Sequence, residues 1–152
     1  MIGYVCKYTP VEVFEAMGVE IGRIQPEVTN FNQADTLMHP NICSFTKSVL
    51  EDVLAGDYEG VVLTTCCDSI RRLYDVLKQQ CPDKFLYLLD VPRKVNDFST
   101  DMYRENILDM VHAYEAFSGK TFDEIVLKQL LERREAGQNL RTAPKNKASV
   151  HI

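Results

Sequence analysis

The sequence of 152 residues lacks several features that mark common protein classes. No run approaches the roughly 18 apolar residues of a membrane-spanning helix, and the N-terminus "MIGYVCKYTP" has neither a basic leader nor the apolar core of a signal peptide. The segment "CKYTPVE" after the first apolar run contains no G-x-G-x-x-G or G-x-x-x-x-G-K motif, so the usual backbone cradles for dinucleotides and nucleotides are missing. We therefore expect no membrane partner, a cytoplasmic location and no nicotinamide chemistry.

Clustered positive charge is also missing from most of the chain. The net charge is −5, and a nucleic-acid partner would need Lys and Arg gathered on the folded body, so we expect no nucleic-acid binding. The one basic segment without acidic residues is the last, "RTAPKNKASVHI", which has no apolar periodicity. We expect a single α/β domain over residues 1–140 and a disordered tail over residues 141–152.

Four apolar runs alternate with helical patterns. The runs "MIGYVC", "VEIGRIQ", "GVVLTTCC" and "KFLYLLDVP" are typical of strands, and the third is apolar throughout, as a strand covered on both faces should be. Alternating strands and helices favour a parallel sheet. The predicted fold is α/β: a three-layer Rossmann-like or flavodoxin-like domain with a roughly four-stranded parallel sheet and two C-terminal helices.

Helix starts are predicted from capping patterns. The first helix should begin at a capping box formed by Thr9 and Glu12, a later one should be capped by Asp68, and the last should begin at a box formed by Thr121 and Glu124. The predicted helices cover residues 10–17, 43–56 with Phe45 on the buried face, 68–80, Met102 to Phe117, and Thr121 to Ala136.

Five cysteines stand in a chain that we expect in a reducing compartment. Disulfides are rare there, so each cysteine should be a thiol, a ligand or a redox group. Ligands of open α/β sheets collect at the carboxyl ends of strands. Cys6, Cys66 and Cys67 stand at such ends, and Cys43 opens a helix that should start at the same edge. Since cysteine is also among the most buried residue types, core packing is the competing interpretation for each of them.

Cys67 is the better ligand candidate of the adjacent pair. Successive residues of an extended segment point to opposite faces, so Cys66 and Cys67 should not share a partner. Cys67 immediately precedes Asp68 and should lie in the loop, whereas Cys66 should pack in the core. Cys81, at the end of a helix, is predicted to be structural.

Three segments resemble the N-terminal half of the 2-hydroxyacyl-CoA dehydratase D-component family, which also contains benzoyl-CoA reductase subunits. They are "GYVCKYTPVEVFEAMG", "HPNICSFTKSVLEDVLAGDYEGVVLTTCCDSIRRLYDVLK" and "FLYLLDVPRK", and the similarity covers about residues 1–135. The resemblance implies a 4Fe-4S cluster held by three cysteines, with one position open to water or substrate. Cys43 in "HPNICS" and Cys67 in "CCDS" match the first two ligands. The third belongs to a second α/β half, so we expect a truncated copy, a frameshifted reading frame or one part of a split protein.

The family implies removal of water from an (R)-2-hydroxyacyl-CoA through a ketyl radical anion. The implied partners are the acyl-CoA substrate, a second dehydratase subunit and an ATP-dependent iron–sulfur activator protein. Three alternatives remain at this point: a non-catalytic α/β remnant or interaction domain, a subunit of a benzoyl-CoA reductase-like enzyme, and a small flavodoxin-like electron carrier. The last is disfavoured because no phosphate-binding loop follows the first strand.

Overall fold

The computed structural model describes residues 1–27 and 29–136, which form four strands and six helices. The strands are β1 (Ile2–Tyr4), β2 (Ile21–Arg23), β3 (Gly60–Thr64) and β4 (Phe85–Leu89). The helices are α1 (Val11–Ala16), α2 (Asn32–Leu37), α3 (Ser44–Ala55), α4 (Asp68–Gln80), α5 (Asp97–Ser118) and α6 (Glu124–Glu135). The alternation of strands and helices is the one that the apolar runs predict.

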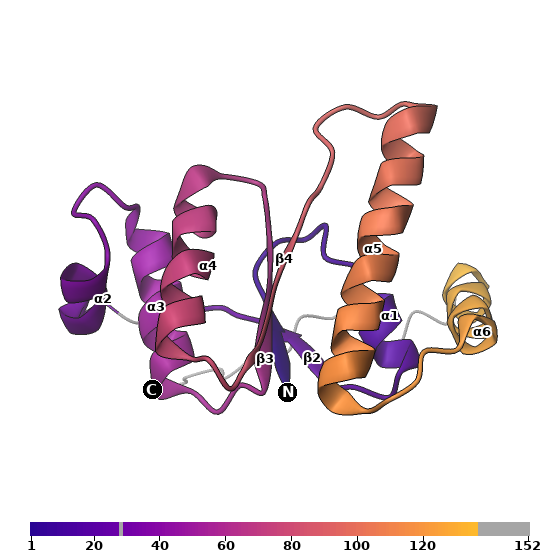
Figure 1. Cartoon of the computed structure of the whole chain (residues 1–152), viewed down its shortest axis with the longest axis horizontal. Helices are drawn as coiled ribbons and strands as arrows, with labels where there is room; N and C mark the ends of the chain where they lie inside the picture. Colours follow the sequence, from indigo (N-terminus) through magenta and orange to yellow (C-terminus); the bar gives the residue numbers. More distant parts are fainter. Residues whose placement is uncertain (28, 137–152) are drawn as a thin grey trace, which may run out of the picture.

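The four strands form one parallel sheet in the order β2-β1-β3-β4. Helices α2, α3 and α4 lie on one side of the sheet, and α1, α5 and α6 lie on the other (Figure 1). The three-layer α/β fold is therefore confirmed. The order matches the flavodoxin-like version of the doubly wound fold, in which the chain reverses its direction of travel across the sheet between β1 and β3.

Each face of the sheet has its own apolar core. On one face, Val49, Leu50 and Val53 of α3 pack with buried residues of α4 and β3. On the other, Tyr114 of α5 is fully buried, and its ring lies 5.3 Å from that of Phe14. The uniformly buried β3 is shared by both cores, which is why its sequence shows no alternation of apolar and polar residues.

Helix α6 is attached differently from the others. It has no buried residue, and it packs on α1 through Arg134, which pairs with Glu12 and with Glu15 of that helix. The Arg134 Nη2 to Glu15 Oε2 distance is 2.6 Å. Ion pairs therefore contribute to the attachment of α6, whereas each of the other helices contains at least one fully buried residue.

All three predicted helix caps are wrong. Thr9 is not the cap of α1, because the cap position belongs to Pro10, and among the described residues the buried Thr9 hydroxyl has no hydrogen-bond partner. The Glu12 side chain pairs with Arg134 and does not form the predicted box. Asp68 is the first helical residue of α4, and the cap position before it belongs to Cys67. Helix α6 starts three residues later than predicted and is capped by the side chain of Asp123, not by Thr121.

The structure also corrects two helix boundaries and one core residue. Helix α5 begins at Asp97 and not at Met102, because Asn96 and Ser99 form a capping box upstream of the apolar stripe. The short α2 was not predicted at all. Phe45 is 49% exposed, because it lies in the first turn of α3, ahead of the buried stripe that begins at Thr46.

Two further expectations concern the C-terminal residues and membrane-spanning helices. The predicted domain end at residue 140 and the predicted tail over residues 141–152 lie outside the described residues. Across the part of the chain that the structure describes, none of the helices combines the length and the apolar character needed to cross a bilayer.

Candidate functional site

The edge of the sheet at the carboxyl ends of β1 and β3 is the switch point of this fold. The chain leaves β1 toward α1 on one face and leaves β3 toward α4 on the opposite face (Figure 1). Loops that diverge in this way leave a crevice between them, which is where open α/β sheets bind ligands. Cys6 lies just beyond β1, and Cys66 and Cys67 lie just beyond β3, so three of the five cysteines stand at this edge.

Cys43 and Cys67 occupy equivalent positions at the starts of neighbouring helices. Each is the N-cap residue of its helix with an extended backbone, and each has an exposed side chain. The carbonyl of Cys43 accepts from the Lys47 N–H of α3 at 3.2 Å, and that of Cys67 accepts from the Arg71 N–H of α4 at 3.3 Å. The positive end of a helix dipole favours thiolate over thiol, so both positions suit soft-metal ligation.

Several neighbouring groups act on the thiol of Cys43 and change its pKa. Its Sγ lies 3.0 Å from Thr46 Oγ1, one turn into α3. Partial burial acts to raise the pKa of Cys43, but interactions with the Thr46 hydroxyl, the Thr46 and Phe45 backbone and the Ser69 hydroxyl outweigh it, so the pKa lies below its ordinary value. Cys43 therefore loses its proton more readily than an ordinary cysteine, which favours metal binding by the thiolate.

Ser69 connects the two helix starts. It is the second residue of α4, two positions after Cys67, and its side chain interacts with the Cys43 thiol of α3. Helices α3 and α4 also pack against each other (Figure 1). The cysteine that opens α3 therefore faces the first turn of the helix that Cys67 opens.

Cys66 does not pack in the core as predicted. Its side chain is exposed, because β3 ends at Thr64 and the chain is already turning at residues 65–66, so the strand alternation no longer applies. Partial burial of its sulfur raises the pKa of Cys66, and the nearby Cys6 and Cys67 thiols act in the same direction. Cys81 is half-buried and packs against the core beside α4, as a structural residue should.

No three metal-ligating side chains gather at this edge or elsewhere among residues 1–27 and 29–136. Cys6 and Cys66 therefore do not complete a three-ligand set with Cys43 and Cys67. What the described residues offer is two exposed thiols at adjacent helix starts. Sequence reasoning did not single out Thr46, although a threonine three residues after a cysteine at a helix start is a readable signal for a hydroxyl directed at that thiol.

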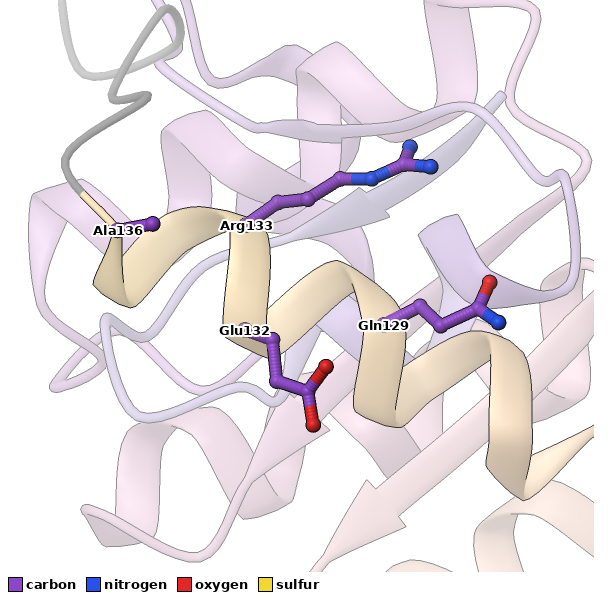
Figure 2. A pocket seen from close by; sticks show the side chains of 4 residues that line it. All are labelled: Gln129, Glu132, Arg133 and Ala136. Carbon is purple, nitrogen blue, oxygen red and sulfur yellow. The ribbon is translucent and has the colours of Figure 1, made fainter.

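Two surface hollows lie along α6 and α4, and the lining of the second includes Asp68, the residue directly after Cys67. One, of about 280 Å³, follows α6 alone and is lined by Gln129, Glu132, Arg133 and Ala136, whose side chains spread along the helix instead of converging (Figure 2). The other, of about 370 Å³, lies beside α4. Its lining consists of two acidic residues, two arginines and one leucine: Asp68, Arg71, Arg72, Asp75 and Leu88. Neither hollow concentrates one sign of charge or any nucleophile.

The sequence matches the family described as "2-hydroxyglutaryl-CoA dehydratase, D-component" over residues 6–146. The chain belongs to this family. It is also similar to the (R)-phenyllactyl-CoA dehydratase beta subunit of Clostridium sporogenes, with 27% identity over 139 residues. The alignment covers 86% of this chain and 36% of that relative, so the chain spans little more than a third of the relative's length.

Proposed function

We propose that this chain is the part of a 2-hydroxyacyl-CoA dehydratase-type subunit that supplies two thiolate ligands, Cys43 and Cys67, to a 4Fe-4S cluster. The observation that carries the proposal is the paired position of the two residues. Both are exposed N-cap cysteines of adjacent helices, and the thiol of one interacts with Ser69 in the first turn of the other helix. The family membership and the dehydratase relative supply the reaction class.

The donor set fits part of a cluster site. Thiolate is the ligand of iron–sulfur clusters, and the lowered pKa of Cys43 makes that form easier to reach. Within the described residues, however, the set stops at two sulfurs, so the third ligand would come from another segment. When bound, the cluster would supply a Lewis-acidic iron and one-electron chemistry.

The chain's own residues have three tasks in this proposal. Cys43 and Cys67 hold iron, the first turns of α3 and α4 favour negative charge on both sulfurs, and the Thr46 hydroxyl keeps the Cys43 thiolate in a fixed orientation. The reaction proposed for the assembled enzyme is loss of water from an (R)-2-hydroxyacyl-CoA to give an enoyl-CoA. Its proposed partners are a second dehydratase subunit and an ATP-dependent iron–sulfur activator in the cytoplasm.

The test is an assay of the assembled protein. The tagged chain is purified without oxygen, with the subunits that bind it, from the organism that encodes it. It is then given (R)-phenyllactyl-CoA or (R)-2-hydroxyglutaryl-CoA together with activator, ATP and reductant. We expect formation of the enoyl-CoA and its loss in Cys43→Ser and Cys67→Ser. Cys81→Ser is the matched control, since that thiol packs against the core and should not affect turnover.

Other results would favour the alternatives. Reduction of an aromatic acyl-CoA without dehydration would identify a benzoyl-CoA reductase-like subunit. Dehydration that persists in both serine variants would show that Cys43 and Cys67 are not ligands. An assembly with full subunit content but no reaction on either class of substrate would favour a non-catalytic interaction domain.

A further inference from the structure

Thr65, the first residue after β3, ties the turn that carries Cys67 to the end of β4. Its backbone N–H donates to the Leu89 carbonyl at 3.1 Å. Its hydroxyl donates to Asp90 Oδ1 at 2.6 Å and accepts from the Val91 N–H at 3.2 Å. Three hydrogen bonds from one buried residue therefore join the two chain segments, and the one to the carboxylate has the short length of a charge-assisted bond.

The Thr65 hydroxyl takes the place of a backbone acceptor between the β3 and β4 segments. The last register pair between β3 and β4 is Thr64 with Leu89, and the chain then turns away at residues 65–66. The Thr65 N–H still forms a backbone hydrogen bond, to the Leu89 carbonyl, whereas the N–H of Val91 donates to the Thr65 hydroxyl and not to a backbone carbonyl. The hydroxyl takes its place, which lets the chain turn while staying attached to β4.

A second contact extends the attachment to α5. The Asn106 side chain of α5 donates to the Asp90 carbonyl at 3.2 Å. The turn after β3 is thereby linked through Asp90 to both β4 and α5. On its other side, Cys67 is bound to α4 through the bond from the Arg71 N–H to the Cys67 carbonyl.

We propose that Thr65 and Asp90 are positioning residues that fix Cys67 at the start of α4. The two residues act through the turn and touch no substrate. The role assigned to Cys67 itself rests on the proposed function. The bridge is a property of the protein without iron, so it can be tested independently of any cluster.

The test follows amide hydrogen exchange in the iron-free chain by NMR. The reporter is the Arg71 amide, because its hydrogen bond ends on the Cys67 carbonyl. In Asp90→Ala, which removes one hydrogen bond of the bridge, we expect this amide to exchange about fivefold faster. Thr65→Val removes two of these hydrogen bonds and should accelerate exchange by at least the same factor. Thr65→Ser keeps the hydroxyl and should restore slow exchange. Amides of β1 and the middle of α3 should not change in any of these variants.

Thr100→Val is the matched control. It also removes a threonine hydroxyl that forms a hydrogen bond, in this case to the Asn96 carbonyl at the start of α5, and it should leave the Arg71 amide unchanged. If Thr65→Val does not fold, Asp90→Ala decides the question, because Asp90 is exposed and its removal leaves the core intact. Unchanged exchange of the Arg71 amide in Asp90→Ala would overturn the proposal, whether or not Thr65→Val folds. Fast exchange of this amide in Thr65→Ser would also overturn it.

A second arm uses the iron content of the anaerobically purified assembly. If the bridge positions a ligand, Thr65→Val should lose iron and Thr65→Ser should retain it. If the Arg71 amide exchanges faster in Thr65→Val but Cys67→Ser keeps its iron, the proposed function is contradicted while the positioning role of Thr65 and Asp90 stands. If the Arg71 amide exchanges slowly in Thr65→Val but Cys67→Ser loses its iron, only the positioning role of Thr65 and Asp90 is contradicted.

Discussion

The sulfur of Cys43 lies 3.0 Å from the hydroxyl oxygen of Thr46, a buried residue one turn further along α3. This contact is one of the interactions that hold the pKa of Cys43 below its ordinary value against the opposing effect of partial burial. It links a feature of the helix start to the chemistry proposed for the site.

Replacing the hydroxyl should make Cys43 less reactive. In Thr46→Val the hydrogen bond is lost while partial burial remains, so the pKa of Cys43 should rise and less thiolate should be present at neutral pH. We expect the pH profile of Cys43 alkylation in the iron-free protein to shift to higher pH, as measured by mass spectrometry of the labelled peptide. Thr46→Ser should behave like the wild type. An unshifted profile in Thr46→Val would show that the contact does not stabilise the thiolate.

The attachment of α6 should depend on Arg134. In Arg134→Met the pairs with Glu12 and Glu15 are lost, and no buried residue of α6 can compensate. Since the side chains are about one-third exposed or less, solvent screening limits the loss in unfolding free energy to about 1 kcal/mol. Amide exchange within α6 should nevertheless accelerate strongly, and raising the salt concentration should have a similar effect on the wild type. Arg133→Met, in the next position and exposed, is the control that should leave α6 protected.

The core between the sheet and α5 should be sensitive at Tyr114. Its ring is fully buried against Phe14 and Phe85, with centroids at 5.3 and 5.0 Å. Tyr114→Ala should lower the unfolding free energy by about 3 to 5 kcal/mol, as expected when a buried aromatic side chain leaves a cavity. Phe98→Ala removes an aromatic ring from the same helix at a position that is 75% exposed, and its effect should stay within about 0.5 kcal/mol. Urea unfolding measures both, and equal losses of unfolding free energy would show that Tyr114 is not packed in the core.

Alkaline pH should destabilise the fold in part through Tyr58. Burial and the hydrogen bond that its hydroxyl donates to Asp52 at 2.8 Å raise the pKa of Tyr58 to about 12. A folded-state pKa above the ordinary value of about 10 means that the stabilisation is complete below about pH 10 and is lost as the pH rises toward 12. Tyr58→Phe should therefore flatten the fall in unfolding free energy over this range. Because burial also raises the pKa values of Tyr87, Tyr103 and Tyr114, part of the fall should remain.

The parts of the fold that sequence reasoning predicted are those set by local apolar pattern. The four strands follow from short apolar runs. The buried faces of α3 and α4 follow from the helical spacing of apolar residues within each helix, such as those around Val49 in α3 and Leu73 in α4. Helix α2 could not be found in this way. Its first amides, those of Gln33 and Ala34, are bound by the Glu51 carboxylate of α3 at 2.7 and 2.8 Å, so the helix is stabilised by a residue distant in sequence.

The candidate site was predictable in outline only. The positions of Cys43 and Cys67 before helices could be read from the sequence, although Cys67 and not Asp68 holds the cap position. The exposure of Cys66 could not, because it depends on where the chain leaves the sheet. At that point the Thr65 hydroxyl binds Asp90, a residue 25 positions away in the sequence, and such a contact cannot be read from local pattern.

The most direct test of the central claim is the iron and acid-labile sulfide content of the anaerobically purified assembly, measured together with its visible absorption. We predict a 4Fe-4S cluster in the wild type and in Cys81→Ser, and its loss in Cys43→Ser and in Cys67→Ser. The isolated chain, which offers two of the proposed ligands, should bind iron weakly or not at all and should not catalyse dehydration. A cluster that remains complete in both serine variants would show that Cys43 and Cys67 do not hold it.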